Sequence, residues 1–408
     1  MSVALVSLLG ILVAIAIGFA FDISTGLVSV AFAFVVGQFL GGMKPNDIIA
    51  GWPTNLFFIL FGVTLLFAIA KTNGTLELLA RKSVYAARGQ AKLIPIVFFL
   101  LAFVLAAIGP GNISVCALVH PISMAVAQET GISPLLMALM VIAGSNAGGL
   151  SPIAPTGIIG VELAKKQGLD TGMHVWINMI ILQIIIGIVS YVFFGGLKIS
   201  TKGQLSRPNP FDKNQLVTLG GIAALVLTVV FLKWNVGLAA FLVAAALLLF
   251  KVADQKKSVA AVPWMTLLLV CGVGVMVNVA GKTGGIKLLT DFLGSFMTPR
   301  SAAAIMALTG GAMSTFSSAS GVVMPTLIPT VPGLIQKLGT TVPPESLVSA
   351  VVQGAHAVTN SPLSTLGALA MAAAPDTIDR EKLFRELLAV GIGGVLFVGI
   401  LMYFGIVR

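Results

Sequence analysis

Residues 144–157 read GSNAGGLSPIAPTG and interrupt an apolar segment of the chain. A related stretch, GAHAVTNSPLSTLG, follows 210 residues later at 354–367, and five positions are identical: Gly144 and Gly354, Ala147 and Ala357, Ser151 and Ser361, Pro152 and Pro362, Gly157 and Gly367. A break in an apolar helix frees backbone N–H and C=O groups, which lipid cannot satisfy. Such breaks are tolerated only where they are buried in protein or line a wet cavity. The duplicated break therefore predicts an interior site in a duplicated membrane fold.

The composition of the whole chain agrees with a membrane location. Of the 408 residues, 57% are hydrophobic and only 9% are charged, whereas ordinary globular proteins carry about 25% charged residues. So few charges could not cover a water-facing surface, which excludes soluble enzymes and nucleic-acid-binding proteins. The net charge of +10 comes mostly from Lys and Arg in short segments that flank apolar runs, as in the cytoplasmic loops of membrane proteins. The predicted fold class is an all-α integral membrane protein.

Apolar runs that could cross about 30 Å of hydrocarbon as a helix occur at 3–21, 24–42, 55–70, 172–196, 215–232, 235–252, 262–280 and 386–406. Four further runs are interrupted. The runs at 92–128 and 299–338 are predicted re-entrant hairpins, and those at 133–164 and 346–374 are predicted broken helices. The fold expected from these runs has about ten transmembrane helices plus two re-entrant helical hairpins and two broken helices.

The internal repeat extends beyond the breaks. The shift of 210 residues also lays Pro53 on Pro263 and Gly62 on Gly272, and a slightly smaller shift lays Pro121 on Pro325. We therefore divide the chain into a first repeat at 1–197, a linker at 198–214 and a second repeat at 215–408. Each repeat has five crossings, and an odd number places the two copies in opposite orientations. Interrupted segments at matching positions of inverted repeats indicate the binding site of a transporter.

The distribution of positive charge predicts the orientation. Under the ten-crossing scheme, one side of the membrane collects fifteen of the 24 Lys and Arg residues, and the side with the excess is normally cytoplasmic. Both termini are then expected outside the cell inner (plasma) membrane, and the linker is expected in the cytoplasm. Residues 72–88 and 283–297 alternate apolar and basic positions at helical spacing, which predicts helices that lie in the membrane interface.

Three motifs carry a resemblance to a known family: GPGNIS at 109–114, GSNAGGLSPIAPTG at 144–157 and TNSPLSTLG at 359–367. They resemble the ion transporter superfamily that includes the divalent anion/sodium symporters, and are most similar to the MatC-type dicarboxylate carriers. The resemblance implies a secondary active transporter of small di- or tricarboxylates, of the malonate or C4-dicarboxylate type. It also implies elevator-type alternating access and a homodimer. The symporters carry a Ser-Asn-Thr triplet at each hairpin tip, whereas the tips here read GNIS at 111–114 and SSAS at 317–320, which leaves substrate and coupling ion open.

The chemistry of an anion site predicts which residues would form it. A carboxylate at the bilayer midplane needs fixed hydrogen-bond donors and helix N-termini, and small polar residues at the tips and breaks supply them. The expected substrate-binding residues are Gly111, Asn112, Ser114, Ser317, Ser318, Ser320, Asn146, His356, Asn360 and Ser361. Side-chain oxygens and freed carbonyls suit a sodium ion, which is expected near Ser145, Asn146, Ser151, Thr359 and Asn360.

Two questions concern the coupling cation and the functional class of the protein. No Asp or Glu falls at the centre of a span, so a carboxylate proton relay has no candidate. The coupling cation is therefore Na⁺ or, with His356 as the group that titrates between pH 5 and 8, H⁺. No catalytic motif, nucleotide-binding motif or resident cofactor is expected, so the chain is not expected to be an enzyme. Its expected partners are a small carboxylate and the lipid bilayer, without nucleic acid. The alternative function is a channel or the membrane subunit of a multicomponent carboxylate uptake system.

Overall fold

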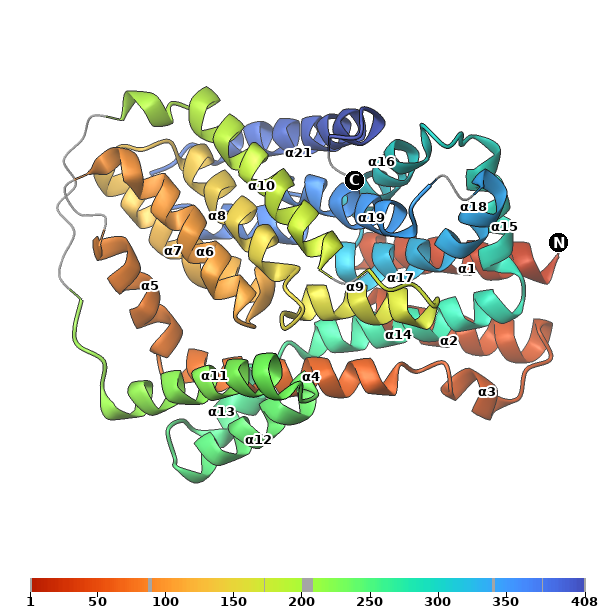
Figure 1. Cartoon of the computed structure of the whole chain (residues 1–408), viewed down its shortest axis with the longest axis horizontal. Coiled ribbons are helices and arrows are strands. Elements are labelled where there is room, and N and C mark those ends of the chain that lie inside the picture. Colours follow the sequence, from red (N-terminus) through yellow and green to blue (C-terminus); the bar gives the residue numbers. More distant parts are fainter. Residues whose placement is uncertain are drawn as a thin grey trace.

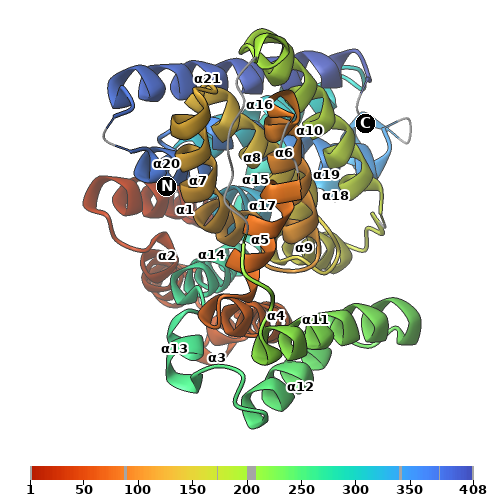
Figure 2. The ribbon, with the colours of Figure 1, turned by 90° about the vertical axis from the view of Figure 1, so that its left-hand side faces the viewer.

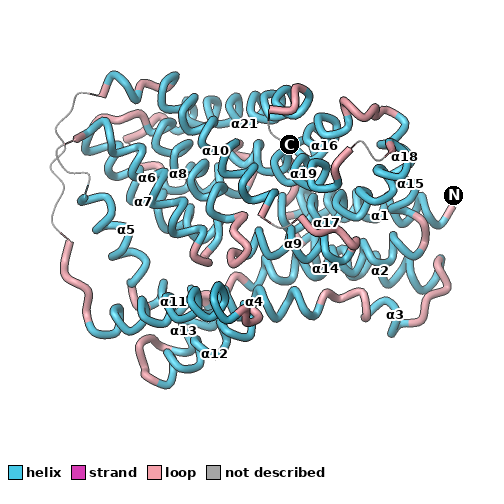
Figure 3. The backbone as a smooth tube through the Cα atoms, viewed as in Figure 1, coloured by secondary structure: helices cyan, strands magenta, loops and turns pink. Residues whose placement is uncertain are grey.

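The computed structural model describes residues 2–86, 90–171, 173–199, 208–339, 342–375 and 377–406. Within these ranges all regular secondary structure is helical (Figure 3), which confirms the predicted all-α membrane protein. Helices in the described residues that are long and apolar enough to cross a membrane are Val3–Phe21, Thr54–Thr72, His174–Phe193, Trp264–Lys282, Ala319–Leu338 and Arg380–Tyr403. Ala319–Leu338 belongs to a predicted re-entrant hairpin, so the number of crossings stays a prediction.

The helices of the first half are α1 (Val3–Phe21), α2 (Thr25–Phe34), α3 (Pro45–Ile49), α4 (Thr54–Thr72), α5 (Thr75–Ala86), α6 (Ile94–Ala107), α7 (Gly111–Thr130), α8 (Pro134–Gly149), α9 (Pro155–Lys166) and α10 (His174–Phe193). A π-helical turn, η1 (Val35–Leu40), extends α2, and 3-10 turns lie at η2 (Ala91–Leu93) and η3 (Gly196–Lys198). Of the predicted linker, residues 200–207 lie outside the described residues.

The helices of the second half are α11 (Lys213–Leu232), α12 (Val236–Leu249), α13 (Gln255–Ala260), α14 (Trp264–Lys282), α15 (Gly285–Ser295), α16 (Ala302–Thr315), α17 (Met324–Leu327), α18 (Val331–Leu338), α19 (Pro344–Ala357), α20 (Thr365–Ala373) and α21 (Arg380–Tyr403). A π-helical turn, η4 (Ala319–Val323), and two 3-10 turns, η5 (Ile328–Thr330) and η6 (Val358–Asn360), join some of them. Figures 1 and 2 place α10 and α21 along one side of the molecule, and α11, α12 and α13 along the opposite side.

The helices α4 and α14 each pack closely against another helix at glycines that lie 210 positions apart in the sequence. Gly62 on α4 faces Gly237 on α12, where an added Cβ would lie 2.4 Å from the Gly237 carbonyl oxygen. Gly272, 210 positions after Gly62, faces Gly26 on α2, where a Cβ would lie 2.2 Å from the Gly26 carbonyl oxygen. Small residues allow the backbones of membrane helices to approach this closely. The pairs α4–α12 and α2–α14, which we call the scaffold, thus pack through similar glycine contacts.

The inner helices form a second group, which packs through the glycines of the broken segments. Gly144 on α8 meets the Phe99 carbonyl of α6, and Gly354 on α19 meets the Ala307 carbonyl of α16. The helices α6 and α16 each have 14 residues. Each precedes a helical arm of 20 residues, at 111–130 and 319–338. The division at 1–197 and 215–408 stays a prediction, and it would account for these matched lengths and contacts.

The first broken helix is interrupted later than its sequence predicts. Ser145 and Asn146 were expected in non-helical backbone, but α8 continues to Gly149 and carries both residues in its last turn. Gly148 allows α8 to pack closely against α6 here, since a Cβ on Gly148 would lie 2.1 Å from the Phe103 carbonyl oxygen. The interruption covers 150–154, and α9 begins with Pro155, a residue suited to the first helical position. In the second copy, α19 ends at Ala357 and α20 begins at Thr365.

Candidate functional site

Two glycines shape the tip of the first hairpin. Gly109 has a φ of +140° and Gly111 a φ of +75°, conformations that side-chain-bearing residues rarely adopt. A Cβ on Gly109 would lie 1.9 Å from the ring of Phe67 on α4, and one on Gly111 would lie 2.9 Å from Cδ of Pro155 on α9. The tip is therefore seated between the scaffold helix α4 and the second half of the first broken helix. With the tip packed in this position, Asn112 lies in the first turn of α7.

A buried chain of side-chain hydrogen bonds starts at Asn112. Its Nδ2 donates to Oδ1 of Asn146 at 3.1 Å, and its Oδ1 accepts from the Thr156 hydroxyl at 3.2 Å. Asn146 Nδ2 donates in turn to the Thr359 hydroxyl at 2.8 Å. Asn112, Asn146 and Thr359 are each at most 5% exposed. We call Asn112, Asn146, Thr156 and Thr359 the polar chain; it joins the first hairpin tip to the helix ends beside the breaks of both broken helices.

His356 adjoins the polar chain through its backbone. The Thr359 hydroxyl donates to the His356 carbonyl at 2.7 Å, whereas the imidazole Nδ1 lies 2.7 Å from the Val352 carbonyl on the preceding turn of α19. A carbonyl only accepts, so Nδ1 carries the hydrogen and Nε2 is the acceptor of a neutral ring. The hydrogen bond holds this ring to the preceding turn of α19.

A small cavity of about 40 Å³ lies where the two hairpin tips meet the scaffold. Its polar lining comes from Gly111, Asn112, Ser114, Thr156 and, from the second hairpin, Ser320. The helices α4 and α14 close it with Leu60, Thr64, Pro263, Thr266 and Leu267. Pockets that hold small-molecule ligands usually measure about 300 to 1,000 Å³. In this conformation the cavity is therefore too small for such a ligand.

Other expected site residues form local hydrogen bonds. The Ser317 hydroxyl donates to the Met313 carbonyl at 2.6 Å, and Ser318 Oγ caps η4 by accepting from the Gly321 N–H at 3.1 Å. Ser361 Oγ accepts from the Leu363 N–H at 3.2 Å, and its backbone packs against Gly391 of α21. The structure therefore does not bring Ser317, Ser318 and Ser361 into the lining of the small cavity.

The expected sodium ligands also differ in their contacts. Ser145 Oγ donates to the Ile142 carbonyl at 2.9 Å and lies 3.0 Å from the Cys116 thiol, and Ser151 Oγ accepts from the Ile153 N–H at 3.4 Å. Asn360 differs because its Nδ2 donates to the Ala357 carbonyl at 3.4 Å, while its buried Oδ1 has no hydrogen-bond partner among the described residues. A buried oxygen without a partner carries a desolvation cost of about 1 to 3 kcal/mol. Asn360 Oδ1 is thus available to a cation.

Sequence reasoning missed three threonines of this region. Thr156 follows Pro155 directly in the break motif, so the motif itself could have indicated it. Thr64 and Thr266 lie within plain apolar helices, where a single threonine gives no signal of function. Only the packing of α4 and α14 against the hairpin tips identifies these two as lining residues.

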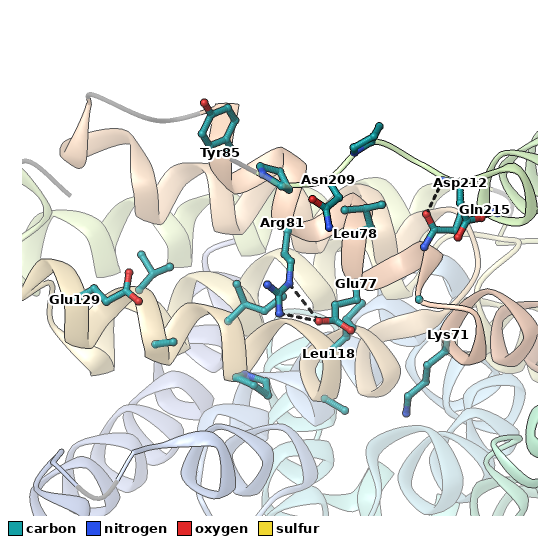
Figure 4. A pocket seen from close by; sticks show the side chains of 18 residues that line it. Lys71, Glu77, Leu78, Arg81, Tyr85, Leu118, Glu129, Asn209, Asp212 and Gln215 are labelled. Atoms are coloured by element: carbon teal, nitrogen blue, oxygen red, sulfur yellow. Dashed lines mark hydrogen bonds and ion pairs between the residues drawn. The ribbon is translucent and has the colours of Figure 1, made fainter. Parts of the chain in front are cut away.

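A second cavity, of about 1030 Å³, extends along α7 on the side away from the tip (Figure 4). It is lined by α5, by α7 from Ala117 to Glu129, and by the segment that leads into α11. Its charged lining residues are Lys71, Glu77, Arg81, Glu129 and Asp212. Both signs of charge are present, so the lining does not by itself select an anion.

Comparison with known proteins finds a family model and several relatives that match part of this chain. Residues 1–149 match the family model described as the dicarboxylate carrier protein MatC N-terminus. This match agrees with the predicted resemblance, and it covers the stretch that contains α6, α7 and Asn146. The chain is also 23% identical over 259 residues to an uncharacterized transporter of Mycobacterium tuberculosis, covering 59% of each protein. It is 24% identical over 252 residues to an uncharacterized transporter of Mycobacterium bovis, covering 57% of each. The chain thus spans less than two thirds of the length of these relatives.

Proposed function

We propose that this membrane protein, whose amino-terminal part is of the MatC type, is a secondary active transporter of small carboxylates of the malonate or C4-dicarboxylate type. The observation that carries the proposal is the polar chain, in which Asn112 of one half of the molecule is linked through Asn146 to Thr359 of the other. Polar side chains buried inside a membrane protein are rare, and they commonly mark a substrate pathway.

The donors around the small cavity suit a carboxylate. The N-terminus of α7 presents Gly111 and Asn112, and the N-terminus of α9 presents Thr156. Helix N-termini carry a partial positive charge and unpaired N–H groups, which attract anions. Ser114 and Ser320 add hydroxyl groups from the two hairpins. One carboxylate group would be held by each hairpin tip, which matches a substrate with two carboxylates.

Movement of the tips against the scaffold would open the site. The scaffold contributes mainly apolar side chains to the small cavity, among them Leu60 and Leu267. An apolar surface offers few hydrogen bonds that a sliding unit would have to break. We therefore propose elevator-type alternating access, in which both hairpins and broken helices move as one unit along α4 and α14.

The coupling cation in this proposal is Na⁺, held at Asn360 Oδ1 with carbonyl groups freed by the break at 361–364. A cation there would satisfy the unpaired oxygen and neutralise part of the substrate charge. Proton coupling through His356 is the competing option. Its imidazole already donates to the Val352 carbonyl, and this contact favours a structural role.

The remaining expectations belong to the same proposal. The protein would lie in the cell inner (plasma) membrane with both termini outside, and it would form a homodimer through scaffold helices. A channel or a subunit of a multicomponent uptake system is the alternative. The small volume of the cavity at the tips favours a transporter, because a channel needs a continuous polar path across the membrane.

Uptake into proteoliposomes tests the function. Purified protein is offered radiolabelled malonate, succinate or citrate, with a sodium gradient or a pH gradient imposed separately. We expect saturable uptake of at least one dicarboxylate that depends on one gradient. Uptake that neither saturates nor requires a gradient would favour a channel. Absence of uptake of all three acids by monodisperse protein would contradict the proposed substrate class.

A further inference from the structure

The interface between α10 and α19 contains a buried cluster of three polar side chains. Ser349 Oγ on α19 accepts hydrogen bonds from Asn178 Nδ2 of α10 at 3.2 Å and from Gln353 Nε2 at 2.9 Å. Ser349 and Gln353 are 0% exposed, and Asn178 is 8% exposed. Gln353 Oε1 is buried and has no hydrogen-bond partner among the described residues. We call Asn178, Ser349 and Gln353 the amide cluster; it contains an oxygen acceptor that no described group satisfies.

The fold builds the same interface a second time without polar side chains. Figures 1 and 2 show α10 beside α19, and the matching contact in the other half joins α21 to α8. The shift of 210 residues that aligns the two breaks lays Leu139, Ala143 and Leu388 on Ser349, Gln353 and Asn178. Leu139 is 0% exposed and packs in one apolar cluster with Leu387 of α21. Apolar side chains therefore suffice for this helix contact, and packing alone does not explain the amide cluster.

The chemistry of the amide cluster suits a monovalent cation. A buried oxygen without a partner destabilises a protein unless water or an ion satisfies it. Amide and hydroxyl oxygens are ligands of hard cations, whereas Ca²⁺ and Mg²⁺ are usually bound through carboxylates as well. The amide cluster has no carboxylate, and in the described part of the chain no three His, Cys, Asp or Glu side chains gather as a metal site would require. A cation at Gln353 Oε1 would therefore carry a single charge.

The charge of the proposed substrate requires such a cation. A dicarboxylate carries two negative charges near neutral pH, because carboxyl groups titrate near pH 4. None of the described residues that line the small cavity is charged, and helix N-termini supply only partial positive charge. One sodium ion at Asn360 neutralises one carboxylate. A second monovalent cation balances the other, and it removes the cost of carrying a net charge through a protein surrounded by lipid.

We propose that the amide cluster is a second sodium site, in which Gln353 Oε1 binds the ion and Asn178 and Ser349 supply further oxygen atoms. The inference rests on the proposed function, in which Asn360 holds the first sodium ion. A half-turn of the Asn178 amide exchanges its nitrogen for its oxygen, so each of the three side chains can present an oxygen. Gln353 and Asn360 are two helical turns apart, roughly 10 Å along the axis. Both ions would therefore move together with the second broken helix.

Binding of radioactive sodium to purified protein in detergent tests the site without requiring transport. We expect the wild-type protein to bind two ions per chain at saturation. Gln353→Met keeps the length of the side chain and removes the amide, so it should bind one ion, a twofold loss. Gln183→Met is the matched control, because Gln183 on α10 is 2% exposed and its Nε2 donates to Met179 Sδ of its own helix. This control should still bind two ions.

The sodium dependence of dicarboxylate uptake gives a second measurement of the same site. In proteoliposomes, the Hill coefficient for sodium should fall from about 2 towards 1 in Gln353→Met, because it cannot exceed the number of sites. Gln353→Glu keeps an oxygen at this position and adds a negative charge. We expect it to retain both ions and to need a severalfold lower sodium concentration, since an opposite charge attracts the cation.

The outcomes separate the second site from the proposed function. Two ions bound by monodisperse Gln353→Met protein would show that Gln353 Oε1 bonds to water alone, and would overturn the site. An equal loss in Gln183→Met would attribute the effect to packing and would also overturn it. Where Gln353→Met does not fold, an unchanged sodium affinity in Gln353→Glu decides against the site. Dicarboxylate uptake with one sodium ion would overturn only the second site, whereas two bound ions without uptake of any acid would overturn only the proposed substrate.

Discussion

Asn146, in the last turn of α8, donates a hydrogen bond of 2.8 Å to the hydroxyl of Thr359, which lies 213 residues later in the chain. Both side chains are buried, and Asn112 extends the connection to the first hairpin tip. The hydrogen bond joins the end of α8 in the first half directly to η6, beside the break in the second half. Networks of this kind are strong when every member is paired and costly when one is removed.

Removal of Asn146 tests the polar chain. Asn146→Ala removes the acceptor of Asn112 Nδ2 and the donor to the Thr359 hydroxyl in a buried environment, so we expect substrate affinity to fall by about 1 to 3 kcal/mol, or roughly 5- to 150-fold. Isothermal titration calorimetry with the transported acid measures this affinity. Thr228→Ala is the control, because that hydroxyl bonds only to the Leu225 carbonyl of its own helix α11. Equal affinity in the two variants would exclude the polar chain from the site.

The second prediction concerns the stability of the protein when Gly111, at the first hairpin tip, is replaced. Gly111→Ala puts a Cβ into a left-handed conformation and 2.9 Å from Pro155 Cδ, so we expect a loss of stability of about 1 to 3 kcal/mol. Gly220→Ala on α11 is the matched control, since nothing lies within 4 Å of its added Cβ; an alanine there should be neutral or stabilise by about 0.5 to 1 kcal/mol. Melting curves in detergent compare the two. A Gly111→Ala protein as stable as Gly220→Ala would show that the tip relaxes without cost.

The third prediction tests whether both ends of the first hairpin lie on the same side of the membrane. If 92–128 returns to the side that it enters, single cysteines at both ends should be labelled from one face. Gln90→Cys and Gln128→Cys occupy exposed positions just before α6 and near the end of α7. With the native cysteines replaced, we expect a membrane-impermeant maleimide to reach both positions from the cytoplasmic face. Labelling from opposite faces would indicate a full crossing and would contradict the inverted arrangement of the two halves.

The nature of the coupling cation is the fourth prediction. Asn360→Ala removes the unpaired buried oxygen, so we expect it to raise the sodium concentration needed for half-maximal uptake about tenfold, the effect of roughly 1.4 kcal/mol. His356→Gln should keep the sodium dependence, because the ring bonds only to the backbone of α19 among the described residues. Uptake driven by a pH gradient in sodium-free buffer, and lost in His356→Gln, would instead assign the coupling to a proton at this imidazole.

The sequence alone determined the class of the protein and where its interior site would lie. A chain with 9% charged residues must bury itself in lipid, and breaks in apolar helices must face protein or water. Both statements depend on composition and on local order along the chain. For this reason Asn112, Asn146 and Thr359 could be expected near one another before any contact was known.

Only the tertiary structure decided which of these polar groups face each other. Ser361 stands in the same motif as Thr359, and Ser317 stands at the predicted tip of the second hairpin, yet each bonds to its own turn. Thr266 carries no signal in its sequence, yet α14 brings it to the hairpin tips. The direction of a side chain depends on the rotation and end point of its helix, and packing between helices far apart in the chain sets both. Sequence can therefore predict that a polar site exists, whereas the fold selects its members.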